Sequence, residues 1–150
     1  MVERYEKFSS AVSGISCFIQ KIEAEVMKGY GLKGACAQYL TAMRGSKEGI
    51  TISRLSDICA KDKAAVSRAV AELESKGFVE RKGAGMYRAS LVLTDKGKAV
   101  AESVANKASA AVEIAGKGLS DEERQTLYCA LDLIATNLSD ISKKGLENKI

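Results

Sequence analysis

The side chains that could bind an anion gather in two short segments of the chain. The first segment combines cations with small residues: Lys61, Lys63, Ala64, Ser67 and Arg68. The second surrounds a glycine-rich turn and contributes three cations: Arg81, Lys82 and Arg88. Lysine and arginine donate hydrogen bonds to phosphate oxygens, and arginine can also donate to the edge of a guanine base. This chemistry favours a phosphate-rich partner, provided that the fold places both segments on one surface.

The chain offers little of the chemistry that catalysis or metal binding requires. It contains no histidine, which is the commonest general base and the commonest metal ligand. It has no glycine-rich phosphate loop, and Ser67 has no partner that would activate its hydroxyl. The four cysteines form no CxxC pair and match no zinc spacing: Cys17, Cys36, Cys59 and Cys129. We therefore expect no enzymatic activity, no cofactor and no metal.

Length and composition indicate a globular protein. The chain has 150 residues, of which 46% are hydrophobic and 28% charged, so one domain can bury a core. The net charge of +4 permits an anionic partner without requiring one. We find no secretory signal and no apolar run long enough to span a bilayer. We therefore expect a cytoplasmic protein with reduced thiols and no membrane partner.

The first basic segment is predicted to lie on a helix over residues 62–76. Asp62 can cap its start and Gly77 ends it. At about 100° per residue, one face of this helix is apolar and should face the core: Val66, Ala69, Val70 and Leu73. The opposite face is small, with one long cation: Ala64, Ser67, Arg68, Ala71 and Ser75. Small residues let a helix backbone approach base edges in a major groove, whereas a simply solvated helix more often carries Glu and Lys.

A short helix is predicted just before this one, over residues 51–60, with Thr51 as a plausible N-cap. Only Lys61 and Asp62 separate the two helices. Two short helices joined by a tight turn form a helix-turn-helix, whose second helix contacts DNA. An ordinary helical hairpin inside a bundle is the alternative interpretation.

The second basic segment is predicted to form a hairpin over residues 78–93. Its first strand is 78–82, Gly83-Ala84-Gly85 is the turn, and 86–93 is the return strand. Alternation places Arg88 and Ser90 on the face opposite Leu91 and Leu93. A basic hairpin beside a groove-binding helix can contact the DNA backbone or the minor groove. The alternative is a set of solvated charges that protect an edge strand from pairing.

Both ends of the chain are predicted to be long helices, each with a single apolar stripe that recurs in steps of three and four. The N-terminal stripe is Tyr5, Phe8, Val12, Ile15, Ile19, Ile22 and Val26. The C-terminal stripe follows a capping box at Ser120–Glu123 and is Leu127, Leu131, Ile134, Leu138 and Ile141. An alanine-rich helix from 94 or 95 to 115 precedes it. Such stripes favour a dimer interface, with packing inside one helical bundle as the alternative.

The chain resembles the MarR/SlyA family of winged helix-turn-helix transcriptional regulators over nearly its whole length. The order and spacing of several short motifs carry the resemblance. They are Gly31-Leu32-Lys33, Gln38-Tyr39-Leu40, Ile50-Thr51-Ile52-Ser53-Arg54-Leu55, Ala65-Val66-Ser67-Arg68, Leu73-Glu74-Ser75-Lys76-Gly77-Phe78-Val79-Glu80-Arg81 and Leu93-Thr94-Asp95-Lys96-Gly97. The chain departs from the family at the wing, where most members carry an Asp-x-Arg element. Here Gly83 to Arg88 occupies that place without the Asp, and Arg88 stands in for the Arg.

The resemblance implies a mainly α fold with a small β-hairpin, in which residues 1–150 form one MarR-like domain. Residues 32–94 would be the winged helix-turn-helix lobe, and residues 1–30 and 95–150 would be the helices that interlock in a homodimer. Helix 62–76 would lie in the major groove of a pseudo-palindromic, double-stranded operator, with hairpin 78–93 as the wing. The residues predicted to bind DNA are Thr51, Lys61, Lys63, Ala64, Ser67, Arg68, Arg81, Lys82 and Arg88.

Members of this family are usually repressors of nearby genes, and many are released by small aromatic or phenolic ligands. By analogy, a ligand pocket would lie between the dimer helices and the DNA-binding lobe, lined by Phe18, Ile22, Tyr39 and Met43. Those residues are equally consistent with ordinary core. Other members respond to cysteine oxidation, which makes Cys17 the redox candidate, with a small buried hydrophobe as the alternative.

We therefore predict a dimeric DNA-binding transcriptional regulator that acts as a ligand-responsive repressor. A winged-helix protein-interaction or adaptor module without DNA binding is the alternative. A cysteine-based, redox-sensing regulator is a further one. A DNA-binding assay separates the first two hypotheses.

Overall fold

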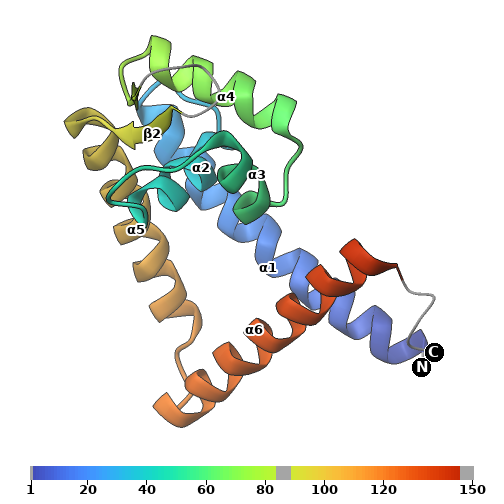
Figure 1. Cartoon of the computed structure of the whole chain (residues 1–150). Coiled ribbons are helices and arrows are strands. Elements are labelled where there is room, and N and C mark those ends of the chain that lie inside the picture. Colours follow the sequence, from blue (N-terminus) through green and yellow to red (C-terminus); the bar gives the residue numbers. More distant parts are fainter. Residues whose placement is uncertain (1, 84–88, 146–150) are drawn as a thin grey trace. The chain divides into compact units, whose positions relative to one another are not determined.

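The computed structural model describes residues 2–83 and 89–145, which form six helices and a two-stranded sheet (Figure 1). In chain order, the elements are α1 (Val2–Gly29), α2 (Cys36–Arg44), α3 (Ile52–Cys59), α4 (Lys63–Ser75), β1 (Val79–Lys82), β2 (Ser90–Leu93), α5 (Asp95–Ala115) and α6 (Asp121–Lys144). The predicted fold, mainly α with a small β-hairpin and a winged helix-turn-helix, is confirmed. The chain divides within α5 into two compact units, residues 1–110 and residues 111–150. The prediction of one domain stays a prediction.

The first unit has a continuous apolar core, to which α1 to α5 and both strands contribute. The largest fully buried side chains include Phe78, Met27, Leu40, Leu55, Leu73 and Leu91. The predicted core face of α4 is confirmed, because Val66, Val70 and Leu73 are completely buried and Ala69 packs against the core. Burying a side chain of this size contributes about 1.5–3 kcal/mol. The core therefore fixes which face of α4 is exposed.

Side-chain caps define the two helices of the helix-turn-helix, as predicted. The Thr51 hydroxyl accepts a hydrogen bond from the Arg54 backbone N–H at 3.2 Å, which starts α3. The Asp62 carboxylate accepts hydrogen bonds from the backbone N–H groups of Ala64 and Ala65, which starts α4. Between the helices Ala60 has a φ of 50°, the left-handed region. This residue reverses the chain within the short connection between α3 and α4 (Figure 1).

The sheet is an antiparallel pair in which Val79 lies opposite Leu93 and Lys82 lies opposite Ser90. Val79, Leu91 and Leu93 are buried, which agrees with the predicted alternation. Ile50 adds an isolated bridge, exchanging backbone hydrogen bonds with Leu91 at 2.9 and 2.8 Å. Ile50 therefore belongs to the edge of the sheet, and the helix starts after the Thr51 cap. The predicted turn and the start of the return strand, 84–88, lie outside the described residues.

The segment between α1 and α2 is irregular over residues 30–35, and α2 begins at Cys36. Gly31 has a φ of 68°, and a Cβ on Gly34 would lie 2.8 Å from the Ala24 Cβ of α1. The chain therefore passes close against α1 in an irregular segment before α2 begins.

The second unit contains the end of α5, a short connection and α6. The predicted capping box starts α6, since the Ser120 hydroxyl accepts from the Glu123 N–H and the Glu123 carboxylate accepts from the Ser120 N–H. The Arg124 guanidinium donates to the Gly116 carbonyl at 2.9 Å and to the Glu113 carboxylate at 3.0 Å. These contacts hold the corner between α5 and α6.

Candidate nucleic-acid interface

The exposed face of α4 carries the small residues and the cation that the sequence placed there. Ala64, Arg68, Ala71 and Ser75 are exposed, and Ser67 is half-buried. Among the described residues, no ion pair involves Arg68. The face therefore presents a free guanidinium between small side chains, which suits close approach to a groove.

The start of α4 attracts anions through its lysines more than through its backbone. A single Asp62 oxygen accepts from the backbone N–H groups of Ala64 and Ala65, at 2.9 and 3.0 Å. These amides are the donors that a phosphate at a helix start would otherwise use. Lys61 and Lys63 are exposed on either side of the cap. Their ammonium groups are the ones positioned to bind phosphate.

The start of α3 adds a cation that the sequence analysis did not select. Arg54 is exposed in the first turn of α3, immediately after the Thr51 cap. Thr51 is also exposed, and its hydroxyl oxygen serves the cap while its proton is free to be donated. The first helix of a helix-turn-helix crosses the DNA backbone. The position of Arg54 in the first turn of that helix could have identified it from the sequence.

The two described cations of the hairpin, Arg81 and Lys82, differ in exposure and in their carboxylate partners. Arg81 donates two hydrogen bonds to Glu74 of α4, from Nε at 2.8 Å and from Nη2 at 3.0 Å. The bonds to Glu74 raise the pKa of the Arg81 guanidinium. Lys82 is 67% exposed, and its nearest carboxylate is the exposed one of Glu80 at 3.6 Å. Arg88, the predicted wing arginine, lies outside the described residues.

The four residues predicted for an effector pocket do not share one cavity. Tyr39 and Met43 are buried in the core, Ile22 is half-buried, and Phe18 is 65% exposed, with the Lys21 ammonium 5.4 Å from its ring centre. A nearby cavity is lined by other residues of α1, α2 and the connections around them: Gln20, Glu23, Ala24, Gly34, Ala35, Gln38 and Lys61. Burial raises the pKa of Glu23. This cavity has a mixed polar and apolar lining, and one of its lining residues, Lys61, lies just before α4.

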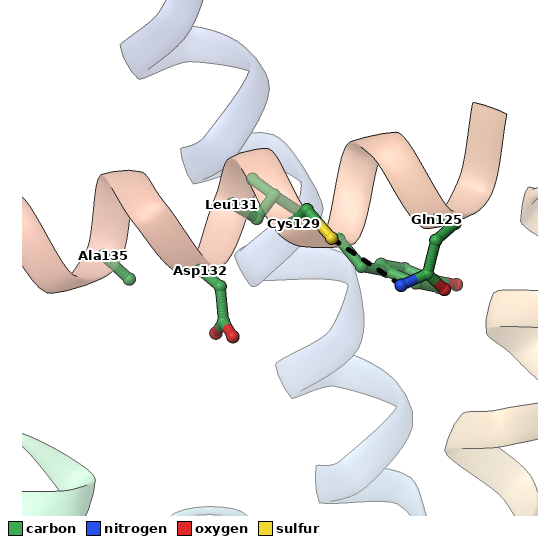
Figure 2. Close-up of a pocket in the computed structure, with 6 residues that line it drawn as sticks. Gln125, Cys129, Leu131, Asp132 and Ala135 are labelled. Atoms are coloured by element: carbon green, nitrogen blue, oxygen red, sulfur yellow. Dashed lines mark hydrogen bonds between the residues drawn. The ribbon is translucent and has the colours of Figure 1, made fainter. Parts of the chain in front are cut away.

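The cysteines fall into two groups. Cys36 and Cys59 are buried, and burial raises the pKa of both thiols, which disfavours the reactive thiolate. The redox candidate Cys17 is exposed rather than buried. Cys129 is also exposed. Figure 2 shows it in a shallow depression on α6, where the Gln125 amide lies 3.6 Å from its sulfur.

The stripes of the terminal helices are largely exposed on the single chain. On α1, only Val26 and Met27 are buried, while Tyr5 is 68% and Ile15 61% exposed. On α6, no residue is buried, and its stripe residues Leu127, Leu131, Ile134 and Leu138 are all exposed. Exposed apolar stripes of this length are typical of interaction surfaces.

Comparison with known proteins supports the predicted family. Residues 30–86, which include α2, the helix-turn-helix and β1, match the model of the MarR family. A solved structure from Methanosarcina mazei Go1, a MarR transcriptional regulator, superposes with a TM-score of 0.79 at 26% identity over 91% of this chain and 92% of that chain. The family match covers residues 30–86, and the fold of the chain is similar to that of MarR-family structures over most of its length. The predicted resemblance to this family is confirmed.

Two further MarR-family structures extend the comparison. A regulator from Listeria monocytogenes, solved in complex with 26mer DNA, has a TM-score of 0.82 at 25% identity over 91% of this chain and 93% of that chain. A regulator from Peptoclostridium difficile has a TM-score of 0.79 at 25% identity over 89% of this chain and 88% of that chain. No protein of curated function matches the chain. The fold similarity covers the terminal helices as well as the lobe.

Within residues 2–83 and 89–145, no helix is long and apolar enough to cross a membrane. The same residues contain no group of three or more His, Cys, Asp or Glu side chains that could hold a metal ion.

Proposed function

We propose that this protein is a homodimeric DNA-binding transcriptional regulator that places α4 in the major groove of a pseudo-palindromic operator. The exposed face of α4, with the free Arg68 between small residues, carries the proposal. The similar Listeria monocytogenes protein, solved with 26mer DNA, supports it. A dimer with two such helices contacts half-sites one helical turn apart, and the operator symmetry follows from the protein symmetry.

The residues predicted to bind DNA, other than Arg81, each have a role in this proposal. Arg68 and Ser67 contact base edges, and Ala64 keeps the helix close to them. Lys61 and Lys63 contact phosphates at the start of α4, and Thr51 with Arg54 contacts the backbone from α3. The wing contributes the cations Lys82 and Arg88.

The homodimer is proposed because of the apolar stripes on α1 and α6. Their exposed side chains include Tyr5, Ile15, Leu131 and Leu138. A second copy of the chain offers the same stripes, and a symmetric dimer is the commonest assembly of soluble proteins. The dimer also supplies the second α4 that a pseudo-palindromic site requires.

We further propose that the protein is a repressor released by a small ligand. Operator binding by a dimer excludes other proteins from the same DNA. The cavity lined by Glu23 and Lys61 lies near the start of α4, where a bound ligand would alter the phosphate-binding lysine Lys61. This cavity is therefore a better candidate than the four residues predicted from sequence, although an aromatic ligand is compatible with either.

The test is DNA binding by fluorescence polarisation, with an operator selected from genomic fragments. Arg68→Ala should weaken specific binding by about 1–3 kcal/mol and relax base preference at one position of each half-site. Lys98→Ala is the control, because it also removes one positive charge but lies on α5 in an exposed pair with Asp95. Operator affinity equal to wild type in Arg68→Ala would refute the role of α4. A wild-type protein that binds no fragment at moderate salt would favour the adaptor-module hypothesis instead.

A further inference from the structure

The contact between Arg81 and Glu74 is a two-point ion pair between the hairpin and the DNA-contacting helix. Arg81 lies on β1 and Glu74 near the end of α4, and two different Glu74 oxygens accept from Nε and Nη2 at 2.8 and 3.0 Å. The two side chains are 28% and 26% exposed. The planar guanidinium and carboxylate match in a fork geometry, which fixes orientation as well as distance.

The pair spans the backbone corner between the end of α4 and the start of the hairpin. Gly77 has a φ of 75°, and the Phe78 N–H donates to the Leu73 carbonyl at 2.9 Å, so the backbone reverses tightly at that point. Arg81 follows three residues later, opposite Leu91 in the sheet. The ion pair links the side chains on the two sides of this backbone corner. It limits rotation of β1 relative to α4.

Arg81 is poorly placed to serve as a phosphate contact. Its Nε and Nη2 donors are already used, and its charge is offset by Glu74 within hydrogen-bond distance. A phosphate would have to compete with a carboxylate that is covalently part of the same lobe. Lys82 differs, because it is 67% exposed and its carboxylate neighbour Glu80 is 52% exposed. An exposed pair at 3.6 Å contributes little and exchanges readily with another anion.

We infer that Arg81 is a positioning residue: the Glu74–Arg81 pair fixes the hairpin against α4 so that Lys82 is the cation of β1 that contacts the DNA backbone. This inference rests on the proposed function, because it concerns the interface that α4 and the hairpin form with DNA. It reassigns Arg81, which the sequence analysis placed among the DNA-contacting residues.

The test measures the salt dependence of DNA binding, since each phosphate contact that is lost lowers the slope of log K against log salt by about 0.9. Lys82→Gln should lower the slope by about that amount. Arg81→Gln should lower affinity at a fixed salt concentration by about three- to tenfold, because the hairpin is misplaced and the Lys82 contact is weakened. Added to Lys82→Gln, it should lower neither the slope nor the affinity much further, since the phosphate contact of β1 is already absent. The exchanged variant Glu74→Arg/Arg81→Glu should restore most of the affinity, because it re-forms the ion pair with the two charges exchanged.

A further fall of about 0.9 in the slope when Arg81→Gln is added to Lys82→Gln would overturn the inference, as would an exchanged variant that binds no better than Arg81→Gln. Arg81→Lys controls for a folding defect, because it keeps the positive charge but cannot donate two parallel hydrogen bonds to Glu74. If Arg81 only orients the hairpin, this variant should bind more weakly than wild type. Affinity equal to wild type in Arg81→Lys would support a phosphate contact and contradict the inference. Absence of DNA binding by the wild-type chain would refute the proposed function and this inference together, whereas the Arg81 outcomes refute this inference alone.

Discussion

Apolar residues recur with similar spacing in the lobe formed by residues 32–94 and in the two terminal helices. In the lobe they are buried, whereas on the terminal helices most of them are exposed. In the lobe, Leu40, Leu55 and Leu73 are completely buried. On α6, Leu131 and Leu138 recur with the same helical spacing, yet they are 42% and 52% exposed. The periodicity of apolar residues thus predicts a helix and its apolar face, but it does not say whether that face packs within the chain or against another chain.

The largest effect is expected in the core of the lobe. Leu73→Ala should lower the free energy of unfolding by about 2–5 kcal/mol, because it leaves a cavity under α4. Leu133→Ala is the matched control: Leu133 is 63% exposed on α6, and its truncation should cost much less. Chemical denaturation of both variants at equal concentration measures the contrast. Equal losses would mean that the lobe and α6 do not differ as described.

The next effect concerns the stripe of α6. Leu131→Asp with Leu138→Asp should raise the dimer dissociation constant by about a hundredfold or more, which is about 2.7 kcal/mol, because two charges would be buried at the proposed interface. Sedimentation at several concentrations measures it, and circular dichroism checks that the helices persist. Asp substitutions at the polar positions Thr126 and Thr136 provide the control. An unchanged oligomeric state in the stripe variant would remove the argument for a dimer through α6.

The smallest effect tests the local cap of α6. The Ser120 backbone N–H donates to the Glu123 carboxylate and lowers the pKa of that group from its ordinary value of 4.5. The folded-state pKa is therefore below the unfolded one, so the cap stabilises the helix above the unfolded pKa and ceases to do so as pH falls through the folded pKa. Thermal unfolding of wild type and Glu123→Gln should differ at neutral pH and converge in acid. A difference that persists below the folded pKa would contradict the cap as its source.

The sequence predicted the helices and strands well, because the caps and apolar faces that define them involve residues close together in the chain. The Asp62 and Ser120 caps and the core face with Val66 and Leu73 depend on residues within a turn or two of one another. Contacts between elements were missed. The Arg81–Glu74 pair crosses a backbone corner, and the bridge between Ile50 and β2 joins segments about forty residues apart, which no periodicity encodes.

The candidate site was predicted in part for the same reason. The exposed face of α4 follows from the wheel of one helix, so Ala64 and Arg68 were placed correctly on the surface. A pocket depends on the mutual packing of several elements. Tyr39 and Met43 lie in the core of the single chain, which was the alternative to a pocket, and the cavity that Lys61 helps to line was not predicted.

The start of α5 is joined to the end of α4 by direct contacts. The Thr94 hydroxyl donates to the Gly77 carbonyl at 2.7 Å, and the Lys96 ammonium donates to the Lys76 carbonyl at 2.9 Å while lying 4.1 Å from the centre of the Phe78 ring. A Cβ on Gly97 would collide with the Phe78 carbonyl, so only glycine lets α5 approach this closely. Any tilt of the first turns of α5 therefore moves the end of α4 with it. In a dimer, these contacts between α5 and α4 would therefore set the distance between the two α4 helices, and with it the number of base pairs between the two half-sites.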